Sequence, residues 1–322
     1  MAADEFDIIR KLFAPLATSA AARGLVDDVA LLDARGALVV TTDAIVEGAH
    51  FLADDPIETV AKKALRVNLS DLAAKGAKPV GVLLTLIWPR SRDAAQLAQF
   101  ARGLGEDLQH YNVPLLGGDT TSTTGPLTVS ITAFGEPLGA RTPARADARA
   151  GEQVWITGVI GDGFLGLLSL TDMPEMEGAG VRARYWTPNP PVAFTPEIAR
   201  FASASTDVSD GLIADAGNIA RASGVAIRLD AEAIPLSQYG HAFVSCEGDA
   251  GLVKLVTGGD DYQALFTAPA EQRWEIVRAA KRAGVDVALI GDVEPGEGVR
   301  LVGGGGRVID IPNAGHSHKL GR

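Results

Sequence analysis

Apolar residues follow a helical spacing in some parts of the chain and a strand spacing in others. Phe6, Ile9 and Phe13 fall on one face of a helix that we expect over residues 5–16. Residues 80–88 are almost all apolar, which is typical of a buried strand, whereas residues 93–111 return to the spacing of an amphipathic helix. This alternation of strand and helix patterns predicts an α/β (α+β) fold.

Polar residues interrupt the interior of the helix expected over residues 54–75. Its start carries two aspartates followed by proline at 54–56, and Gly76 is typical of a helix end. Asn68 and Asp71 are poor helix formers, and their spacing of three residues places them on one face. We therefore interpret this face either as a polar patch in contact with water or as a functional surface.

Several further strands are predicted from short apolar runs bounded by turn residues. Residues 29–32 and 38–42 are expected to pair as a hairpin around residues 35–36. Residues 113–116 and 127–134 are two more strands, and the first of them is expected to end in two glycines with an aspartate at its tip.

A change of composition divides the chain. Residues 139–151 are rich in Arg, Ala and Pro and show no apolar periodicity, so we expect one domain over residues 1–140 and a second α/β domain over residues 141–322. The second domain is predicted to contain strands at 153–157, 225–229, 262–267 and 287–290, helices at 192–202, 210–223 and 271–283, and a hairpin turn at 303–306.

Apolar segments that end in aspartate recur along the chain. Each aspartate alone has an ordinary explanation as a turn residue or a helix cap, but together they are harder to explain. Buried carboxylates cost several kcal/mol unless a positive group meets them, and few Lys or Arg lie beside these positions. A hard divalent cation that prefers oxygen ligands is the economical partner. The aspartates in question are Asp27, Asp28, Asp43, Asp71, Asp119, Asp207 and Asp210.

Composition narrows the classes of function. With 29 basic and 40 acidic residues the net charge is 29 − 40 = −11, which disfavours non-specific nucleic-acid binding. Cys246 is the one cysteine of the chain, so an intramolecular disulfide or a cysteine-based zinc site is excluded. The acidic start lacks an apolar signal core, and no apolar run approaches the ~20 residues of a spanning helix. We expect a cytoplasmic protein without a membrane partner.

Common nucleotide and hydrolase motifs are missing from the sequence. It contains neither a P-loop nor the G-x-S-x-G elbow of many hydrolases. Residues 161–166 match G-x-G-x-x-G, but residues 173–178 do not form the second strand with an acidic end that a dinucleotide site needs. We interpret these glycines as a tight turn from strand to helix.

The motifs taken together resemble the thiamine-monophosphate kinase family, of the aminoimidazole ribonucleotide synthetase-like superfamily. The resemblance covers nearly the whole chain, and the stretches around His50 and residues 68–74 are the most telling. It implies a fold of two α/β domains, with N-terminal sheets that pair in a homodimer, and the use of ATP with several Mg²⁺ ions. The motifs are Asp27–Asp28, Thr41–Asp43, Glu47–Phe51, Asn68–Ala74, Gly117–Thr121, Asp207–Leu212 and Gly258–Tyr262.

The resemblance also implies roles for individual residues. The reaction would attach the γ-phosphoryl group of ATP to thiamine monophosphate, with Asp71, Asp119 and Asp210 as the catalytic carboxylates. Gly118, Asp119, Arg145 and Ser209 would contact ATP, and His50, Asp260 and His316 the substrate. The metal ligands implied are Asp28, Thr41, Thr42, Asp43, Asp71, Asp119, Asp207 and Asp210.

Two positions depart from the family pattern, and two other functions compete with this one. Asp260 stands where the family usually has Glu, and His316 stands where it tends to have an aromatic residue. Another ATP-dependent enzyme of the superfamily, resembling selenophosphate synthetase or formylglycinamidine synthetase, is one alternative. The former usually has a reactive Cys near its N-terminus, which this chain lacks. A non-catalytic module that binds nucleotide or metal is the other alternative.

Overall fold

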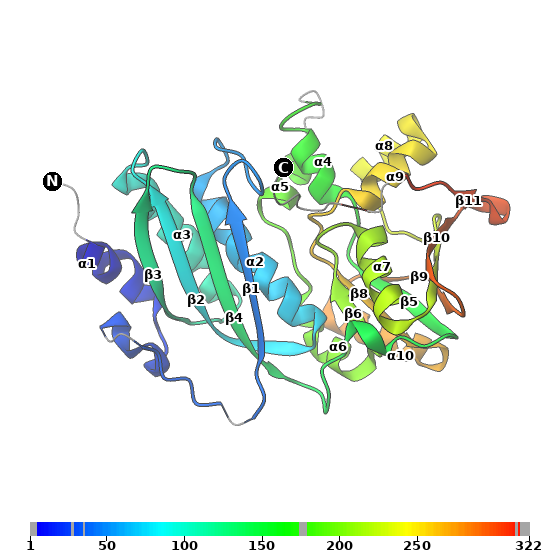
Figure 1. The fold of residues 1–322 in the computed structure, drawn as a ribbon, viewed down its shortest axis with the longest axis horizontal. Helices are drawn as coiled ribbons and strands as arrows, with labels where there is room; N and C mark the ends of the chain where they lie inside the picture. The colour runs from blue at the N-terminus through cyan, green and yellow to red at the C-terminus, as the bar shows by residue number, and fades with distance from the viewer. Residues whose placement is uncertain (1–4, 27–28, 35, 174–178, 313–314, 316–322) are drawn as a thin grey trace. The chain divides into compact units, whose positions relative to one another are not determined.

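The computed structural model describes residues 5–26, 29–34, 36–173, 179–312 and 315, and these form two compact units (Figure 1). Unit 1 contains the described residues of 1–72 and 78–137. Unit 2 contains residues 73–77 and the described residues from 138 onward. Each unit has its own sheet.

Unit 1 is a four-stranded sheet with helices on one face. The strand order is β1-β4-β2-β3, so β1 and β3 form the two edges. β1 is antiparallel to β4, whereas β2 and β3 run parallel. The elements are α1 (Glu5–Ile8), the π-helix η1 (Ile9–Phe13), the 3-10 helices η2 (Ala14–Leu16) and η3 (Ala20–Leu25), β1 (Val39–Val46), α2 (Ile57–Ala74), β2 (Ala77–Pro89), α3 (Ala94–His110), β3 (Leu115–Thr123) and β4 (Thr128–Pro137).

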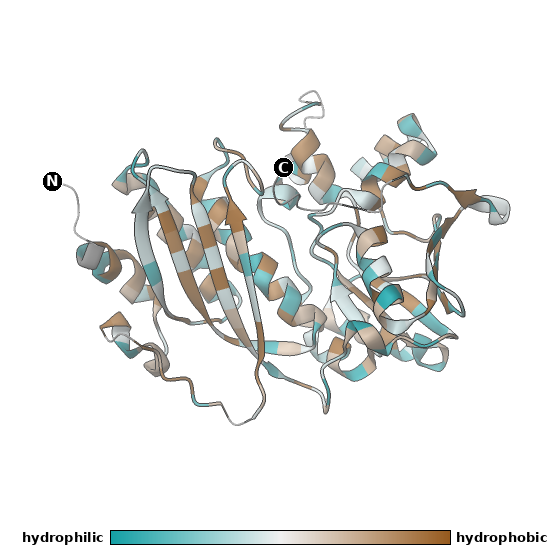
Figure 2. Ribbon diagram, in the orientation of Figure 1, coloured by the Kyte–Doolittle hydropathy of each residue, from teal (hydrophilic) through white to brown (hydrophobic). Residues whose placement is uncertain are grey.

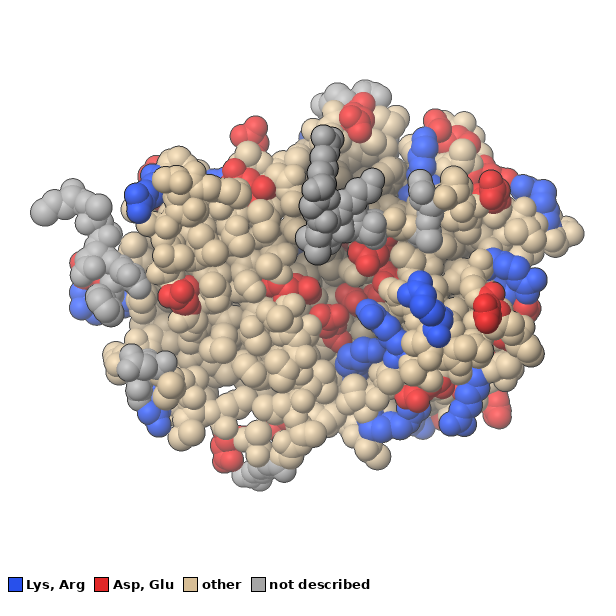
Figure 3. Space-filling model, viewed as in Figure 1, with Lys and Arg blue, Asp and Glu red and all other residues tan. Residues whose placement is uncertain are grey.

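Helices α2 and α3 cover one face of this sheet, and we call the other the open face (Figure 1). Trp88 of β2 is buried and packs edge to face on Phe100 of α3, with ring centroids 6.0 Å apart. Because side chains alternate along a strand, Leu83, Thr85 and Ile87 point to the open face. Strand β4 shows this alternation in its hydropathy (Figure 2), and few charged side chains lie over the open face (Figure 3).

A buried ion pair joins the two helices of unit 1. Arg66 of α2 donates to both carboxylate oxygens of Asp107 in α3, at 2.5 and 2.9 Å. The Arg66 guanidinium also lies 5.6 Å from the ring centroid of Tyr111. Two-pronged pairing of this kind satisfies the buried charges and fixes how the helices pack.

Two local expectations for unit 1 were wrong, and a third was confirmed. Residues 29–32 form no strand, because the Leu31 amide donates to the Ala21 carbonyl at 2.8 Å and β1 pairs with β4 instead. The helix expected over residues 5–16 is confirmed, as consecutive α, π and 3-10 segments. Asp119 does not lie at the tip of a strand, since β3 continues to Thr123.

Unit 2 is a seven-stranded mixed sheet of order β11-β10-β7-β9-β5-β8-β6. Its strands are β5 (Glu152–Thr157), β6 (Ser205–Asp207), β7 (Ala226–Asp230), β8 (Ala264–Pro269), β9 (Val287–Glu294), β10 (Gly298–Val302) and β11 (Val308–Ile309). Its helices are η4 (Arg145–Asp147), α4 (Asp162–Leu168), α5 (Ala179–Trp186), η5 (Val192–Phe194), α6 (Thr195–Phe201), α7 (Leu212–Ser223), α8 (Gln238–Glu247), α9 (Asp249–Thr257), η6 (Ala270–Gln272), α10 (Arg273–Ala283) and η7 (Gly304–Gly306).

Both faces of the unit 2 sheet are buried. Val154 and Ile156 of β5 join one apolar cluster together with residues of α7 and α9. Trp155, between them in sequence, points into a second cluster with residues of α6 and α10. This two-sided burial explains why strand β5 is apolar throughout its centre. The strands and helices expected for this half are present, within a few residues at their ends, and η7 forms the expected turn between β10 and β11. Across the part of the chain that is described, no helix is apolar enough over a sufficient length to span a membrane.

Candidate functional site

Three of the predicted metal residues of unit 1, Thr41, Asp43 and Asp71, lie where strand β1 crosses helix α2. The Thr41 hydroxyl donates to the Asp71 carboxylate, and the Asp43 amide donates to the Asn68 side-chain oxygen at 3.0 Å. The Asn68 amide group in turn donates to the Ala64 carbonyl at 3.0 Å. The polar residues inside α2 therefore tie the helix to the strand, and Asn68 is fully buried.

The pairing of Asp43 with Asp71 favours a cation. Asp43 keeps contact with solvent, but partial burial and the Asp71 carboxylate raise its pKa to about 6. With the Thr41 hydroxyl, these carboxylates form a cluster of hard oxygen donors, the kind that Mg²⁺ binds together with water and phosphate oxygens. Among the described residues, no three His, Cys, Asp or Glu side chains form a complete metal cage. The oxygen atoms of Thr41, Asp43 and Asp71 therefore fit a Mg²⁺ ion whose remaining ligands would be phosphate oxygens and water.

Two other predicted residues of unit 1 lie apart from this pair. The Thr42 hydroxyl contacts Thr132 of β4, at 3.1 Å, on the open face. Asp119 pairs in register with Thr85 and shares the same face. Strands β4 and β2 separate Asp119 from Asp43, a distance of about 14 Å at the usual strand spacing. Within one copy of the chain, Asp119 and Asp43 do not meet.

Gly118 is required by the close approach of β3 to β2. Its φ is +151°, and a Cβ at this position would overlap the Leu84 carbonyl oxygen. At Gly117 the nearest atom to an added Cβ is a Leu83 methyl at 3.4 Å. The two glycines of the Gly-Gly-Asp motif therefore leave the backbone next to Asp119 without side chains.

Unit 2 gathers a second acidic group around the start of helix α7. Asp207 ends strand β6, and Ser209 and Asp210 follow it. Asp215, which the sequence motifs did not single out, belongs to this group, and its carboxylate accepts the amides of Ser209 and Asp210, both at 3.1 Å. Burial, foremost, and the Asp210 charge raise the pKa of Asp215 to about 6. An Asp in the first turn of the helix after Ser-Asp-Gly was the available signal.

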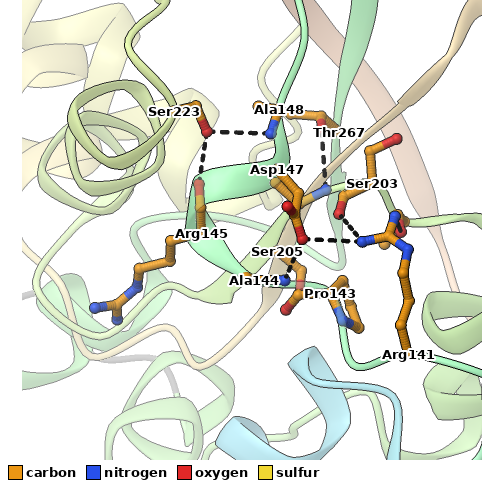
Figure 4. A network of polar contacts seen from close by, with 12 residues as sticks. Arg141, Pro143, Ala144, Arg145, Asp147, Ala148, Ser203, Ser205, Ser223 and Thr267 are labelled. Carbon is orange, nitrogen blue, oxygen red and sulfur yellow. Dashed lines mark hydrogen bonds and ion pairs between the residues drawn. The ribbon is translucent and has the colours of Figure 1, made fainter.

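Arg145 lies next to this acidic group. Its Nε donates to the Thr206 hydroxyl at 3.1 Å, and its charge lowers the pKa of Asp215. Its backbone is fixed in a polar network (Figure 4), where the Ser223 hydroxyl donates to the Arg145 carbonyl at 2.7 Å and accepts the Ala148 amide at 3.1 Å. In Figure 4 the Arg145 side chain points away from this network.

Asp260 lies in a strained loop. Its φ is +66°, uncommon for a residue other than glycine, although Asp tolerates it better than most. The Asp260 amide donates to the Ser209 carbonyl at 2.8 Å, and the Tyr262 amide donates to the Val208 carbonyl at 2.8 Å. These bonds hold the predicted substrate residue beside the predicted ATP residue Ser209.

The glycines at residues 161–163 pack against this same loop. The buried Asp261 carboxylate accepts the Gly161 amide at 2.9 and 3.0 Å and the Gly163 amide at 3.4 Å. Burial raises the pKa of Asp261 well above its ordinary value, and the two amides oppose this shift. A Cβ at Gly163 would overlap the Asp260 carbonyl. The expectation of a tight strand-to-helix turn is therefore confirmed, with Gly161 in the left-handed conformation at the start of α4.

Two predicted residues, Asp28 and His316, lie outside the described part of the chain. Gly315, which precedes His316, lies against unit 2, and a Cβ there would come within 2.6 Å of the Asp210 carbonyl. His50 is half-buried in the turn after β1, whose contacts are described below.

Comparison with known proteins identifies the class. The N-terminal domain model of the AIR synthase related proteins matches residues 26–136, and the C-terminal domain model matches residues 149–304. The chain is therefore an AIR synthase related protein, which confirms the expected two-domain fold.

Individual relatives narrow the class further. A thiamine-monophosphate kinase from Caulobacter vibrioides is 43% identical over 301 residues, which are 92% of this chain and 85% of the relative. The crystal structure of thiamine-monophosphate kinase from Stenotrophomonas maltophilia superposes with a TM-score of 0.79 at 34% identity, over 88% of this chain and 91% of that one. A structure of AaThiL complexed with AMPPCP and TMP gives a TM-score of 0.77 at 31% identity, over 97% of both chains. The chain belongs to the thiamine-monophosphate kinase family.

Proposed function

We propose that this chain transfers the γ-phosphoryl group of ATP to the phosphate of thiamine monophosphate, which yields thiamine diphosphate and ADP. The main support is the likeness, along 97% of both chains, to a protein solved with AMPPCP and TMP. The acidic groups around Asp71 and Asp210 suit this chemistry, because a chain of net charge −11 needs cations to hold two phosphate compounds.

Oxygen donors in each unit are the proposed Mg²⁺ ligands. In unit 1 these are Thr41, Asp43 and Asp71, and in unit 2 Asp207 and Asp210. Bound Mg²⁺ would neutralise the charge of the phosphate groups. Asp71 accepts the Thr41 hydroxyl and so keeps its carboxylate turned toward β1. Asp215 holds the Ser209–Asp210 backbone through two amide bonds, so we assign it a positioning role.

ATP contacts are assigned to Gly118, Asp119, Arg145 and Ser209. Gly118 leaves backbone without a side chain, and Arg145 offers a planar cation suited to phosphate oxygens. The acceptor phosphate is already an anion, so the transfer needs little proton removal. The residues act mainly by aligning donor and acceptor and by balancing charge.

His50, Asp260 and His316 are the proposed substrate contacts. Thiamine carries a permanent positive charge on its thiazolium ring, which a carboxylate such as Asp260 would favour. Asp260 is one methylene shorter than the Glu usual in the family, but its backbone is held firmly by the Ser209 carbonyl.

We also propose a homodimer in which the open faces of two unit 1 sheets pack together. Asp119 and Thr42 lie on that face, apart from Asp43 and Asp71, so a second copy is one way to complete the acidic set. In this proposal residues 1–140 form the ATP- and Mg²⁺-binding domain that dimerises. Residues 141–322 form the second α/β domain, to which the further contacts assigned above to Arg145, Asp207, Ser209 and Asp210 belong. A cytoplasmic location belongs to the same proposal.

The decisive experiment measures ADP release from purified protein with ATP, Mg²⁺ and thiamine monophosphate, and identifies thiamine diphosphate as the product. Thiamine and inorganic selenide serve as alternative acceptors, since selenide turnover would favour a selenophosphate synthetase. EDTA should abolish nucleotide binding and turnover, and Mg²⁺ should restore both. Nucleotide binding without turnover of any acceptor would instead support a non-catalytic module.

A further inference from the structure

Lys63 is a buried lysine whose role neither the proposed reaction nor the metal set explains. It lies in α2 with 2% of its surface exposed. Its ammonium group donates to the His50 carbonyl at 3.1 Å. Lysine is rarely buried to this degree because taking an ammonium group out of water is costly. The contact with the His50 carbonyl is therefore expected to have a function that offsets the cost of burying Lys63.

The His50 turn is closed by reciprocal bonds with Val46. The His50 amide donates to the Val46 carbonyl at 2.9 Å, and the Val46 amide donates to His50 Nδ1 at 3.1 Å. A further backbone hydrogen bond within the same turn runs from the Gly48 amide to the Phe51 carbonyl, at 2.8 Å. The imidazole is thus tied to the backbone of its own turn, and the Lys63 ammonium holds the same turn from the helix side.

This geometry selects one form of the imidazole. Because Nδ1 accepts an amide hydrogen, the ring carries its own hydrogen on Nε2 in the neutral state. His50 then acts as a hydrogen-bond donor through Nε2, in a fixed orientation. A turn that lost its anchor to α2 would let the ring rotate and the other tautomer form.

We propose that Lys63 is a positioning residue for thiamine monophosphate binding, which acts by holding His50 in the Nε2–H form. The inference rests on the proposed function, since it takes His50 to contact this substrate. Lys63 itself touches neither substrate nor nucleotide in this proposal. Its effect on turnover passes through the His50 backbone and ring.

The neighbouring lysine provides a matched control. Lys62 precedes Lys63 in the same helix, but its ammonium group pairs with Glu106 of α3 at 2.6 Å, where the Glu106 side chain is 54% exposed. Lys62→Met and Lys63→Met remove the same charge from adjacent positions. Lys63→Met is expected to raise the KM for thiamine monophosphate about tenfold and to leave the KM for ATP within twofold, whereas Lys62→Met should change neither.

A double-mutant cycle with His50→Ala tests whether the effect passes through His50. If Lys63 acts through this ring, Lys63→Met should cause no further rise in KM once His50 is alanine. Effects that multiply in the double variant, or an unchanged KM in folded Lys63→Met, would overturn the proposal. Lys63→Gln keeps a neutral N–H donor and should recover part of the affinity, and the same cycle can be run with it if Lys63→Met does not fold.

A spectroscopic measurement separates this inference from the proposed function. Long-range ¹H–¹⁵N NMR spectra of the imidazoles, assigned with His50→Ala, should show His50 as the Nε2–H tautomer in the wild type and as a mixture in Lys63→Met. An unchanged His50 signal in Lys63→Met contradicts the positioning role whatever the reaction. If the wild type forms no thiamine diphosphate, the proposed function fails on its own, and the NMR comparison still decides whether Lys63 positions the ring.

Discussion

At the scale of single residues, Asp71 gives the sharpest test of the metal assignment. Asp71→Asn should lower kcat by at least about a hundredfold, because a neutral amide oxygen is a far weaker Mg²⁺ ligand than a carboxylate. The fold should persist, since the Thr41 hydroxyl can still donate to that amide oxygen. Asp54→Asn, at an exposed aspartate before α2, is the control in steady-state assays. Full activity in Asp71→Asn would remove this residue from the metal set.

Asp260 requires a substitution that respects its backbone. Its φ of +66° means that Ala would add strain to the loss of charge, whereas Asn tolerates this conformation. Asp260→Asn should therefore keep the loop and raise the KM for thiamine monophosphate about tenfold, with the KM for ATP nearly unchanged. If the KM for thiamine monophosphate stays at its wild-type value, Asp260 only shapes the turn.

Asp261 predicts a pH dependence of stability. Burial raises its pKa in the folded state, so between its unfolded pKa and its folded pKa the folded chain binds a proton that the unfolded chain has lost. This contribution is present at acid pH and is lost as the pH rises. Wild type therefore loses stability between pH 4 and pH 8, whereas Asp261→Asn, which has no carboxyl group at this position, does not. The free energy of unfolding of Asp261→Asn minus that of wild type should accordingly increase from pH 4 to pH 8. Urea titrations at several pH values measure the difference. A relative stability that falls with pH would mean that the Gly161 and Gly163 amides dominate and keep the carboxylate charged.

At the scale of elements, the pairing of strand β3 with β2 depends on the absence of a side chain at Gly118. Gly118→Ala would place a methyl group on the Leu84 carbonyl oxygen, which forces β3 away from β2. We expect a loss of about 1–3 kcal/mol or more in the free energy of unfolding, together with weaker ATP binding. Gly117→Ala, whose added methyl meets a Leu83 methyl at 3.4 Å, is the matched control and should cost less. Equal effects of the two variants in thermal unfolding would show that the close approach of the strands is unimportant.

Helix α2 both contributes to the core of unit 1 and positions polar side chains of the candidate site. Most of its residues are buried, and several of its polar residues make specific contacts: Asn68 with Asp43, Asp71 with Thr41, Arg66 with Asp107. The interpretation of the Asn68–Asp71 face as a patch in contact with water is wrong for Asn68, whose side chain is fully buried. Its low helix propensity is offset by the bonds it makes to strand β1.

At the scale of the whole molecule, the open face of unit 1 predicts a dimer. Leu83, Ile87 and Phe134 are only half-buried there, and Asp119 shares this face with them. Sedimentation at micromolar concentration should give roughly twice the 33.4 kDa of the chain. Leu83→Asp should shift the protein toward monomer, because a charge would be buried in the interface. Val308→Asp, at a position 59% exposed in unit 2, should leave the dimer intact. A monomeric wild type would contradict the proposal.

The order of the elements and the family were readable from the sequence, because hydrophobic periodicity and short motifs are local properties. The helix over residues 54–75 is a clear case, since its start and end signals both lie within it and α2 is found there. The motifs around His50, Asn68 and Asp207 indicated the family in the same way. These features need no knowledge of which strands pair.

Only the tertiary structure decided which of these residues meet. The sequence motifs group Asp43 and Asp119 as one metal set, but the sheet order places them on opposite edge strands, because strand pairing is set by contacts distant in sequence. The hairpin at residues 29–42 failed for the same reason, because β4 offers β1 a longer pairing partner. Lys63 was passed over because its role comes from a contact with the His50 carbonyl, which only folding brings within hydrogen-bond distance. The contacts of Asp215 with residues 209–210 are local, so its position in the first turn of α7 was a signal that the sequence did contain.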